Sequence, residues 1–364
     1  MKFNEYPLST ICSRLSSGKS IKSSQLVPSG KFPVYGGNGI RGFTESSNFS
    51  GTCAIIGRQG AMCGNVRYFV GDAYMTEHAV VVCGNELADT RYLYYLLSTL
   101  NLGRLSAQSA QPGLSVKTIS KQIVRIPDIK YQRKISSFLG TFDDKIELNN
   151  KIIKNIENQI QDIYVDSFSK LTNYSSGKLS DILDLRQQKI TPDDVGLLPY
   201  LPIDSIPCKS FAIDNFRPSE DAKSSLIRFK VDDILIGAMR VYFHRVAPAP
   251  VDGVTRNTCL VLTPKEPCFF AFCLATCNQN SCIDYAQSIS KGSTMPYTFW
   301  DKGLSEYKVK IPDRDSITSY QKLVLPMVRQ IQLLANENIK LRAIRETLLP
   351  KIISGEIELQ DNQE

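Results

Sequence analysis

The chain has 364 residues, of which 42% are hydrophobic, and this length leaves room for two globular domains of ordinary size. No run of 18 apolar residues occurs and the first ten residues do not resemble a signal peptide, so neither a membrane span nor export is expected. Ten cysteines in such a chain favour reduced thiols in the cytoplasm over a disulfide scaffold.

The net charge of +7 is concentrated in the first part of the chain. Residues 1–130 hold 14 Lys and Arg against 7 Asp and Glu, whereas residues 179–316 hold 16 against 17. A basic unit favours a polyanionic partner, most commonly nucleic acid, although a merely soluble basic surface stays open on charge alone. The neutral second unit would have to bind nucleic acid through a local patch.

The first 130 residues are rich in short extended runs joined by tight turns. The glycine-rich stretch 35–39 predicts a turn between two extended runs, and two apolar runs, 53–56 and 79–82, predict buried strands. Residues 57–60 predict a turn that presents an arginine and a glutamine. A short helix is expected over 89–100, with its apolar residues facing inward.

A long helix is expected over 131–175. From Ile135 to Ile163 apolar residues recur at alternating steps of four and three, which is the seam of a coiled coil, and Asn149 occupies one seam position. About 35 to 40 residues in a helix span roughly 55 Å.

The second globular unit, 176–316, has the same alternation of runs and turns. Strands are expected at 231–236 and 258–262, and a helix at 269–286. Residues 240–245 alternate basic or polar with apolar side chains, which predicts a strand with one exposed positive face.

A second long helix is expected over 317–358, followed by a short tail at 359–364. Its seam runs from Val324 to Ile352 with Asn338 inside it, and Arg345 interrupts it. Pro326 is expected in the first helical turn, where a missing N–H costs little.

The two halves repeat each other. The segment LSTIC at Leu8 returns as LSDIL at Leu179, and Tyr131-Gln132 returns 189 positions later as Tyr320-Gln321. Asn149 and Asn338 share that offset of 189. A buried asparagine pair fixes register and partner, whereas a surface asparagine on a slightly rotated helix is the alternative for either residue alone. We expect an antiparallel helix pair with one globular unit at each end.

Several motifs fail as catalytic or metal sites. The stretch 17–20 ends like a phosphate-binding loop, but Ser13 stands where that loop needs glycine. The cysteines between 268 and 282 lack zinc-finger spacing and lie in an apolar stretch. His78 and His244 have no nucleophile pattern around them. We therefore expect no catalytic centre, no metal and no cofactor.

The residues resemble the specificity subunits of type I restriction–modification enzymes. The stretches FDDKIELNNKI, from Phe142, and LLPKIISGEIEL, from Leu348, are similar to that family's central and C-terminal conserved helices. The runs IIGRQGAMCGNV and ILIGAMRVYFHRVAPAP resemble two classes of its target recognition domains. The similarity covers nearly the whole chain.

The resemblance implies an α+β protein with two target recognition domains, 1–130 and 176–316, separated by two long helices packed as an antiparallel coiled coil. Each domain would read one half of a split double-stranded DNA target. Two adenine methyltransferase subunits and the endonuclease subunits would supply all catalysis. A stand-alone bipartite DNA-binding or scaffold protein is the alternative.

Arginine clamps guanine, and asparagine or glutamine clamps adenine, through paired hydrogen bonds. Polar turns and loops therefore supply the candidates for DNA contact, although for each single residue an ordinary surface role stays open. The first-unit candidates are Asn38, Arg41, Arg58, Gln59, Arg104, Gln108 and Gln111. The second-unit candidates are Arg240, Tyr242, His244, Arg245, Arg256, Asn257, Lys291, Ser293 and Thr294.

Overall fold

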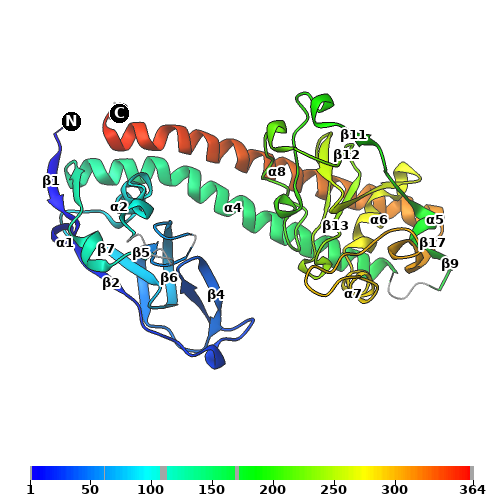
Figure 1. The fold of residues 1–364 in the computed structure, drawn as a ribbon, viewed down its shortest axis with the longest axis horizontal. Helices are drawn as coiled ribbons and strands as arrows, with labels where there is room; N and C mark the ends of the chain where they lie inside the picture. The colour runs from blue at the N-terminus through cyan, green and yellow to red at the C-terminus, as the bar shows by residue number, and fades with distance from the viewer. Residues whose placement is uncertain (1, 61, 107–112, 169–171, 361–364) are drawn as a thin grey trace. The chain divides into compact units, whose positions relative to one another are not determined.

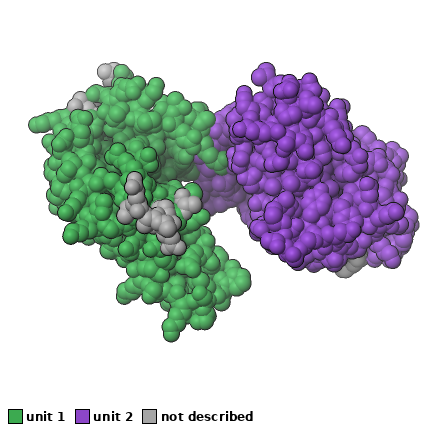
Figure 2. Space-filling view, in the orientation of Figure 1, with its two compact units in different colours: residues 1–144, 342–364 green, residues 145–341 purple. Residues whose placement is uncertain are grey.

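A computed structural model describes residues 2–60, 62–106, 113–168 and 172–360 (Figure 1). The chain divides into two compact units (Figure 2). Unit 1 contains residues 1–144 and 342–364, and unit 2 contains residues 145–341. Both units combine helices with sheets, so the expected α+β class is confirmed. Within the described ranges, no helix is both long and apolar enough to cross a membrane.

Unit 1 is built on a six-stranded sheet in the order β2-β7-β5-β6-β3-β4. Its strands are β2 (Cys12–Ser17), β3 (Phe32–Gly36), β4 (Gly39–Thr44), β5 (Phe49–Gly57), β6 (Val66–Met75) and β7 (Ala79–Gly84). Only the β3–β6 pair among these neighbours is parallel. The buried strands expected at 53–56 and 79–82 are confirmed as parts of β5 and β7.

Helix α2 (Thr90–Thr99) covers one face of this sheet. Its first turn is fixed by Asp89, whose Oδ1 accepts the Tyr92 N–H at 2.8 Å, as expected of an N-cap aspartate. The sequence placed this helix correctly, and Tyr92, Leu93, Leu96 and Leu97 pack inward as expected. Helix α3 (Val116–Ser120) buries Ile119 in the same core as α2.

Unit 2 contains a four-stranded sheet in the order β10-β16-β13-β14 and a three-stranded sheet in the order β11-β12-β15. The strands are β10 (Leu183–Leu185), β11 (Lys189–Ile190), β12 (Leu226–Phe229), β13 (Ile234–Gly237), β14 (Val246–Pro248), β15 (Gly253–Arg256) and β16 (Cys259–Pro264). Neighbouring strands in both sheets are antiparallel.

Two expectations for unit 2 were wrong. Residues 240–245 are not a strand, because Arg240 (φ 51°) and His244 (φ 53°) are left-handed and enclose a 3₁₀ turn, η6 (Val241–Phe243). The single helix expected over 269–286 is two helices, α6 (Phe270–Cys277) and α7 (Asn280–Ser288), since Gln279 is extended between them. A hydrophobic pattern alone does not register such breaks in backbone direction.

Each unit contains the same short arrangement ahead of its main sheet. In unit 1 a strand, β1 (Asn4–Pro7), leads through the one-turn helix α1 (Leu8–Ile11) into β2. In unit 2, β9 (Tyr174–Lys178) leads through α5 (Leu179–Ile182) into β10. The repeated LSTIC and LSDIL segments are therefore these one-turn helices. Leu8, Ile11, Leu179 and Ile182 are buried in their own cores, which explains why these positions repeat.

A two-stranded sheet precedes each long helix. In unit 1, β1 pairs with β8 (Ile123–Ile126), and in unit 2, β9 pairs with β17 (Lys308–Pro312). The repeated Ile-Pro-Asp segments follow, and their aspartates cap the helices: Asp128 Oδ1 accepts the Tyr131 N–H at 3.0 Å, and Asp313 Oδ1 accepts the Ser316 N–H at 2.9 Å.

The long helices are α4 (Ile129–Phe168) and α8 (Arg314–Ser354). Neither follows the expected bounds: β9 already begins at Tyr174, and Gly355, in the left-handed region at φ 83°, ends α8 before residue 358. Pro326 lies inside α8 and not in its first turn, because Asp313 starts that helix earlier than its apolar seam does.

The two helices run antiparallel within each unit. In unit 2, Ile153 and Ile160 of α4 share a core with Val324, Val328 and Ile331 of α8. In unit 1, Ile135 and Leu139 of α4 share a core with Ile352 and Ile353 of α8. The interruption of the seam at Arg345 is compensated by an ion pair with Asp143 of α4, which also accepts the Tyr95 hydroxyl at 2.6 Å.

Candidate nucleic-acid interface

The candidate surface of unit 1 starts at the loop that joins β5 to β6. We call residues 59–64 hairpin loop 1; of these, residue 61 lies outside the described residues. Three backbone hydrogen bonds anchor its base: Gly57 N to Asn65 O at 2.8 Å, Arg58 N to His78 O at 2.9 Å, and Leu114 N to Arg58 O at 2.9 Å. The loop is thereby tied to the turn before β7 and to the segment that precedes α3.

The loop that joins β13 to β14 in unit 2, residues 239–244, has the same anchors, and we call it hairpin loop 2. Gly237 N donates to Arg245 O at 2.9 Å, Ala238 N to Thr258 O at 2.8 Å, and Thr298 N to Ala238 O at 2.9 Å. The strand order β10-β16-β13-β14 correspondingly matches β2-β7-β5-β6. The two units therefore hold loops of equal length on equivalent strands, with different side chains on them.

In unit 1, the turn between β3 and β4 lies against hairpin loop 1. A Cβ on Gly37 would sit 3.3 Å from both the Gln59 and His78 carbonyl oxygens, so glycine permits this close approach. Arg67 of β6 donates to the backbone oxygen of Asn38 at 3.1 Å. The structure thus brings Asn38, Arg58 and Gln59 together, as sequence spacing alone could not show.

Arg67 is a member of this group that the sequence analysis missed. It lies within a strand, where basic residues normally face solvent without further meaning, and only its hydrogen bond to the turn between β3 and β4 shows that it lies beside Asn38. Arg58 is held by its Nε, which donates to the Leu114 oxygen at 2.9 Å, so its orientation is fixed before any ligand arrives.

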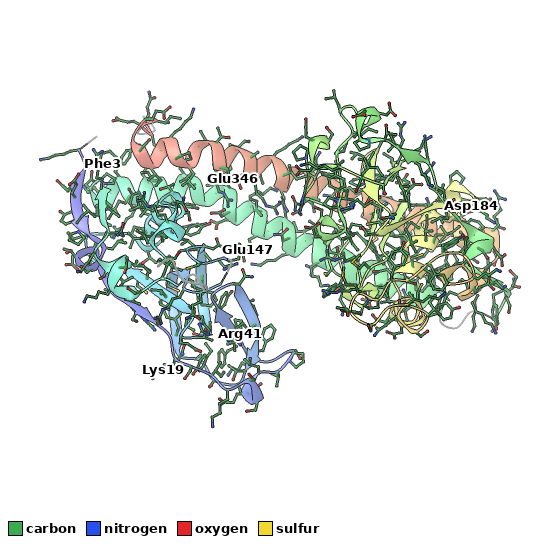
Figure 3. All side chains as sticks on the ribbon, in the orientation of Figure 1. Phe3, Lys19, Arg41, Glu147, Asp184 and Glu346 are labelled. Carbon is green, nitrogen blue, oxygen red and sulfur yellow. The ribbon has the colours of Figure 1, made fainter. Side chains whose placement is uncertain are left out.

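The remaining unit 1 candidates are spread more widely. Arg41 is exposed on β4, and Figure 3 shows it on the same lobe of unit 1 as Lys19. Arg104 is exposed on the 3₁₀ turn η2 (Leu102–Leu105). Gln108 and Gln111 lie outside the described residues.

In unit 2, three candidate segments converge beside hairpin loop 2. Arg240 N donates to Pro296 O at 2.7 Å, and the segment 291–297 closes on itself through Lys291 and Tyr297, whose backbone groups exchange hydrogen bonds of 3.0 and 2.8 Å. The Tyr297 hydroxyl donates to the Asn257 oxygen at 2.8 Å. Burial raises the pKa of Tyr297, so this phenol remains a neutral donor at physiological pH.

The arginines of unit 2 differ in how firmly they are held. Arg245 Nη1 donates to the backbone oxygens of Asp204 and Ile206, whereas exposed Arg256 donates from Nη2 to Ser224 Oγ at 2.9 Å. Ser293 and Thr294 are exposed in the loop that precedes Tyr297.

His244 differs from the other candidates because the residue is only 6% exposed. Its Nε2 lies 3.0 Å from Asn278 O and 2.9 Å from Asn278 Oδ1. The residue therefore anchors hairpin loop 2 and presents no donor at the surface.

The described part of the chain contains no group of three His, Cys, Asp or Glu side chains placed to hold a metal. His78 contacts Glu77 at 3.2 Å. Burial raises the pKa of the Cys273 thiol, and the pKa of Cys277 is raised mainly by its hydrogen bond with Cys282, so both are neutral core residues. What these units offer is arginine, amide and hydroxyl groups on fixed loops, which suits recognition.

Comparison with known proteins agrees with this picture. Residues 2–158 match the model of the type I restriction modification DNA specificity domain. The type I restriction enzyme EcoprrI specificity subunit of Escherichia coli is 40% identical over 112 residues, which are 31% of this chain and 28% of that protein. The MjaIX specificity subunit of Methanocaldococcus jannaschii is 23% identical over 308 residues, 75% of this chain and 70% of that protein.

Among solved structures, the type I restriction-modification S subunit from M. genitalium superposes with a TM-score of 0.62 at 16% sequence identity. The superposition covers 99% of this chain and 97% of that one. At this identity the likeness concerns the fold alone.

Proposed function

We propose that the whole chain is the DNA-reading specificity subunit of a type I restriction–modification system, since residues 2–158 match the model of the type I restriction modification DNA specificity domain. The single observation that carries the proposal beyond residue 158 is the anchoring of hairpin loop 2. Its three backbone hydrogen bonds reproduce those of hairpin loop 1, which lies inside the matched domain.

In this proposal each unit reads one half of a bipartite target. Unit 1 uses Asn38, Arg58, Gln59 and Arg67, with Arg41 and Arg104 on phosphates. Unit 2 uses Arg240, Arg245, Arg256, Asn257 and Lys291, with Ser293 and Thr294. Phosphate contacts supply affinity and register, whereas base-edge contacts supply sequence preference. The different side chains on equivalent loops suit two different half-sites.

The long helices α4 and α8 act as the spacer between the half-sites. Half-site separation in DNA is a geometric quantity of about 34–36 Å per turn, so a reader of two half-sites needs a stiff connection. The subunit itself has no catalytic role: it positions two adenine methyltransferase subunits, which flip the target base, and the endonuclease subunits join that assembly.

Methylation sequencing tests the proposal. The chain is co-expressed with the adenine methyltransferase encoded beside it in a host without other adenine methylation. A split motif, with one methylated adenine on each strand, is the expected result. Domain-swap variants that exchange 1–130 for the same region of a relative should change one half of the motif only. A continuous motif would refute reading by two units.

The alternative is a stand-alone bipartite DNA-binding protein without a methyltransferase partner. Pull-down with the full chain separates the two ideas, since the proposed subunit retains the methyltransferase through a salt wash that removes DNA. Sequence-specific DNA binding by a chain that captures no methyltransferase would favour the alternative.

A further inference from the structure

Hairpin loop 2 ends in an aromatic pair that the DNA-reading proposal does not yet use. Tyr242 and Phe243 are 45% and 44% exposed, and their ring centroids lie 4.9 Å apart at an interplanar angle of 51°.

 The rings are therefore tilted against each other and not stacked flat. Large apolar side chains at this level of exposure mark a contact surface when polar groups surround them.

The backbone holds this pair rigidly. The 3₁₀ turn η6 is enclosed by two left-handed residues, Arg240 and His244, a conformation that costs free energy outside glycine and is retained where the surroundings enforce it. Val241 is 2% exposed and anchors the turn from within, while His244 is fixed to Asn278. Lys209 N also donates to His244 O at 2.8 Å. The aromatic tip is therefore presented without further ordering.

The surroundings of the pair are cationic. The Arg245 guanidinium carbon lies 5.8 Å from the Phe243 ring centroid. Arg240 Nε is buried and has no hydrogen-bond partner among the described residues, which is uncommon for a buried donor. The carboxylate of Asp204, in the same region, forms an ion pair with Arg217, with Nη2 and Oδ2 at 2.5 Å. Flat apolar faces beside two guanidinium groups suit stacked bases between phosphates.

The equivalent loop of unit 1 carries an apolar residue at the same place. The two hairpin loops are related by an offset of 180 residues, as Gly57 and Gly237 are, so Met62 is the equivalent of Tyr242. Met62 is 44% exposed. Methionine, like phenylalanine, is among the side chains that proteins insert between base steps. Both hairpin loops thus expose an apolar side chain beside their polar candidates.

We infer that Tyr242 and Phe243 form a wedge that inserts at one base step of the duplex bound by unit 2 and partly unstacks it. The inference rests on the proposed function and adds indirect readout to it. Opening a step costs least at flexible pyrimidine–purine steps, so the wedge would favour certain sequences at a position without base-edge contacts. No covalent step is involved.

The test uses the full chain and duplexes that contain the motif found by methylation sequencing, with 2-aminopurine placed at successive steps of the unit 2 half-site. The variant Tyr242→Ala/Phe243→Ala is compared with Tyr242→Phe/Phe243→Tyr, which keeps both rings. Leu197→Ala is the control, because Leu197 is fully exposed on the same unit. Thermal unfolding verifies that each variant folds.

Wild type and the ring-keeping variant should raise 2-aminopurine fluorescence at one step, and the double alanine variant should lose that rise and bind about 10- to 100-fold more weakly. Unchanged fluorescence and affinity in the double alanine variant would overturn the wedge. So would normal DNA binding combined with loss of methyltransferase capture, which would assign the pair to a protein contact. Absence of specific DNA binding by wild type would refute the proposed function itself, and the wedge with it.

Discussion

Asn149 of α4 donates from Nδ2 to Asn338 Oδ1 of α8 at 2.9 Å, and both side chains are completely buried in unit 2. Asn149 Nδ2 also donates to Glu337 at 2.8 Å, and Asn338 donates to Asn150 at 2.9 Å. The two asparagines that share a repeat offset in the sequence thus meet inside the helix pair. Such a polar contact in an apolar seam favours one register over its neighbours.

Replacing one asparagine of this pair should cost more than replacing both. In Asn338→Leu, the buried Asn149 amide loses its Asn338 acceptor and keeps only Glu337, and the free energy of unfolding should fall by about 1–3 kcal/mol. The variant Asn149→Leu/Asn338→Leu should recover part of that loss, because no buried amide is left and the seam becomes apolar. Urea denaturation of the wild type, the two single variants and the double variant gives the four free energies of unfolding that are compared. Asn336→Leu, at an exposed position, is the control. Additive losses would show that the two side chains are not coupled.

The glutamines that repeat at 132 and 321 should differ in importance. Gln132 is fully buried, accepts the Asp89 N–H at 3.0 Å and donates to Leu87 and Pro127 oxygens at 2.9 Å. Gln321 is less buried and makes two such bonds, to Ala271 N and Pro267 O. Gln132→Leu should therefore lower the melting temperature more than Gln321→Leu, since it orphans more buried groups. Equal shifts in differential scanning calorimetry would contradict this account.

The carboxylate of Asp233 should matter far more than that of Asp204. Asp233 is 1% exposed, accepts two bonds from Arg186 at 2.6 and 3.1 Å, and also binds Thr263 and Lys230. Asp233→Ala should cost about 3–5 kcal/mol, because it leaves a largely buried guanidinium unpaired. Asp204→Ala removes a solvent-exposed pair with Arg217 and should cost about 0–1 kcal/mol. Chemical denaturation of both variants measures the two losses in free energy of unfolding.

Arg58 should contribute to DNA affinity and preference. Its Nε is fixed by Leu114 O, which leaves the Nη groups for a guanine. Arg58→Ala should weaken specific binding by about 1–3 kcal/mol and relax preference at one base pair. Arg58→Lys keeps the charge but not the two-pronged contact, so it should keep most of the nonspecific affinity and lose the preference. Fluorescence anisotropy with matched and single-mismatch duplexes measures the affinity and the base preference of each variant. Unchanged binding in both variants would remove Arg58 from the reading surface.

Stability should fall at alkaline pH because of two thiols in unit 1. Burial raises the pKa of Cys12 and of Cys53 from 9.0 to about 12. Between these values the unfolded chain releases protons that the folded chain keeps, so the free energy of unfolding decreases as pH rises from 9 towards 12, whereas below pH 9 these thiols add no pH dependence. Urea denaturation at several pH values should show a shallower fall for Cys53→Ala than for the exposed control Cys208→Ala. Identical slopes would show that Cys53 does not contribute.

The long helices and several strands could be predicted from local patterns in the sequence. The heptad seam predicted both long helices because 3.5-residue periodicity is a property of contiguous sequence, and the apolar runs at 53–56 and 79–82 predicted strands for a similar reason. The residues at which the helices begin were missed, since Asp128 and Asp313 set them through side-chain caps outside the apolar pattern. The turn at Arg240 was read as a strand because alternation does not encode left-handed φ angles.

The sequence by itself determined the repeat and the two long helices, and it predicted the pairing of Asn149 with Asn338, because each depends on periodicity and offset along the chain. Only the tertiary structure decided which polar residues act together. Asn38, in the turn between β3 and β4, meets Arg67 of β6 across 29 residues of sequence, and His244 is buried although its neighbours Tyr242 and Phe243 stay exposed. The equivalence of the two hairpin loops likewise depends on long-range backbone hydrogen bonds, which no contiguous pattern specifies.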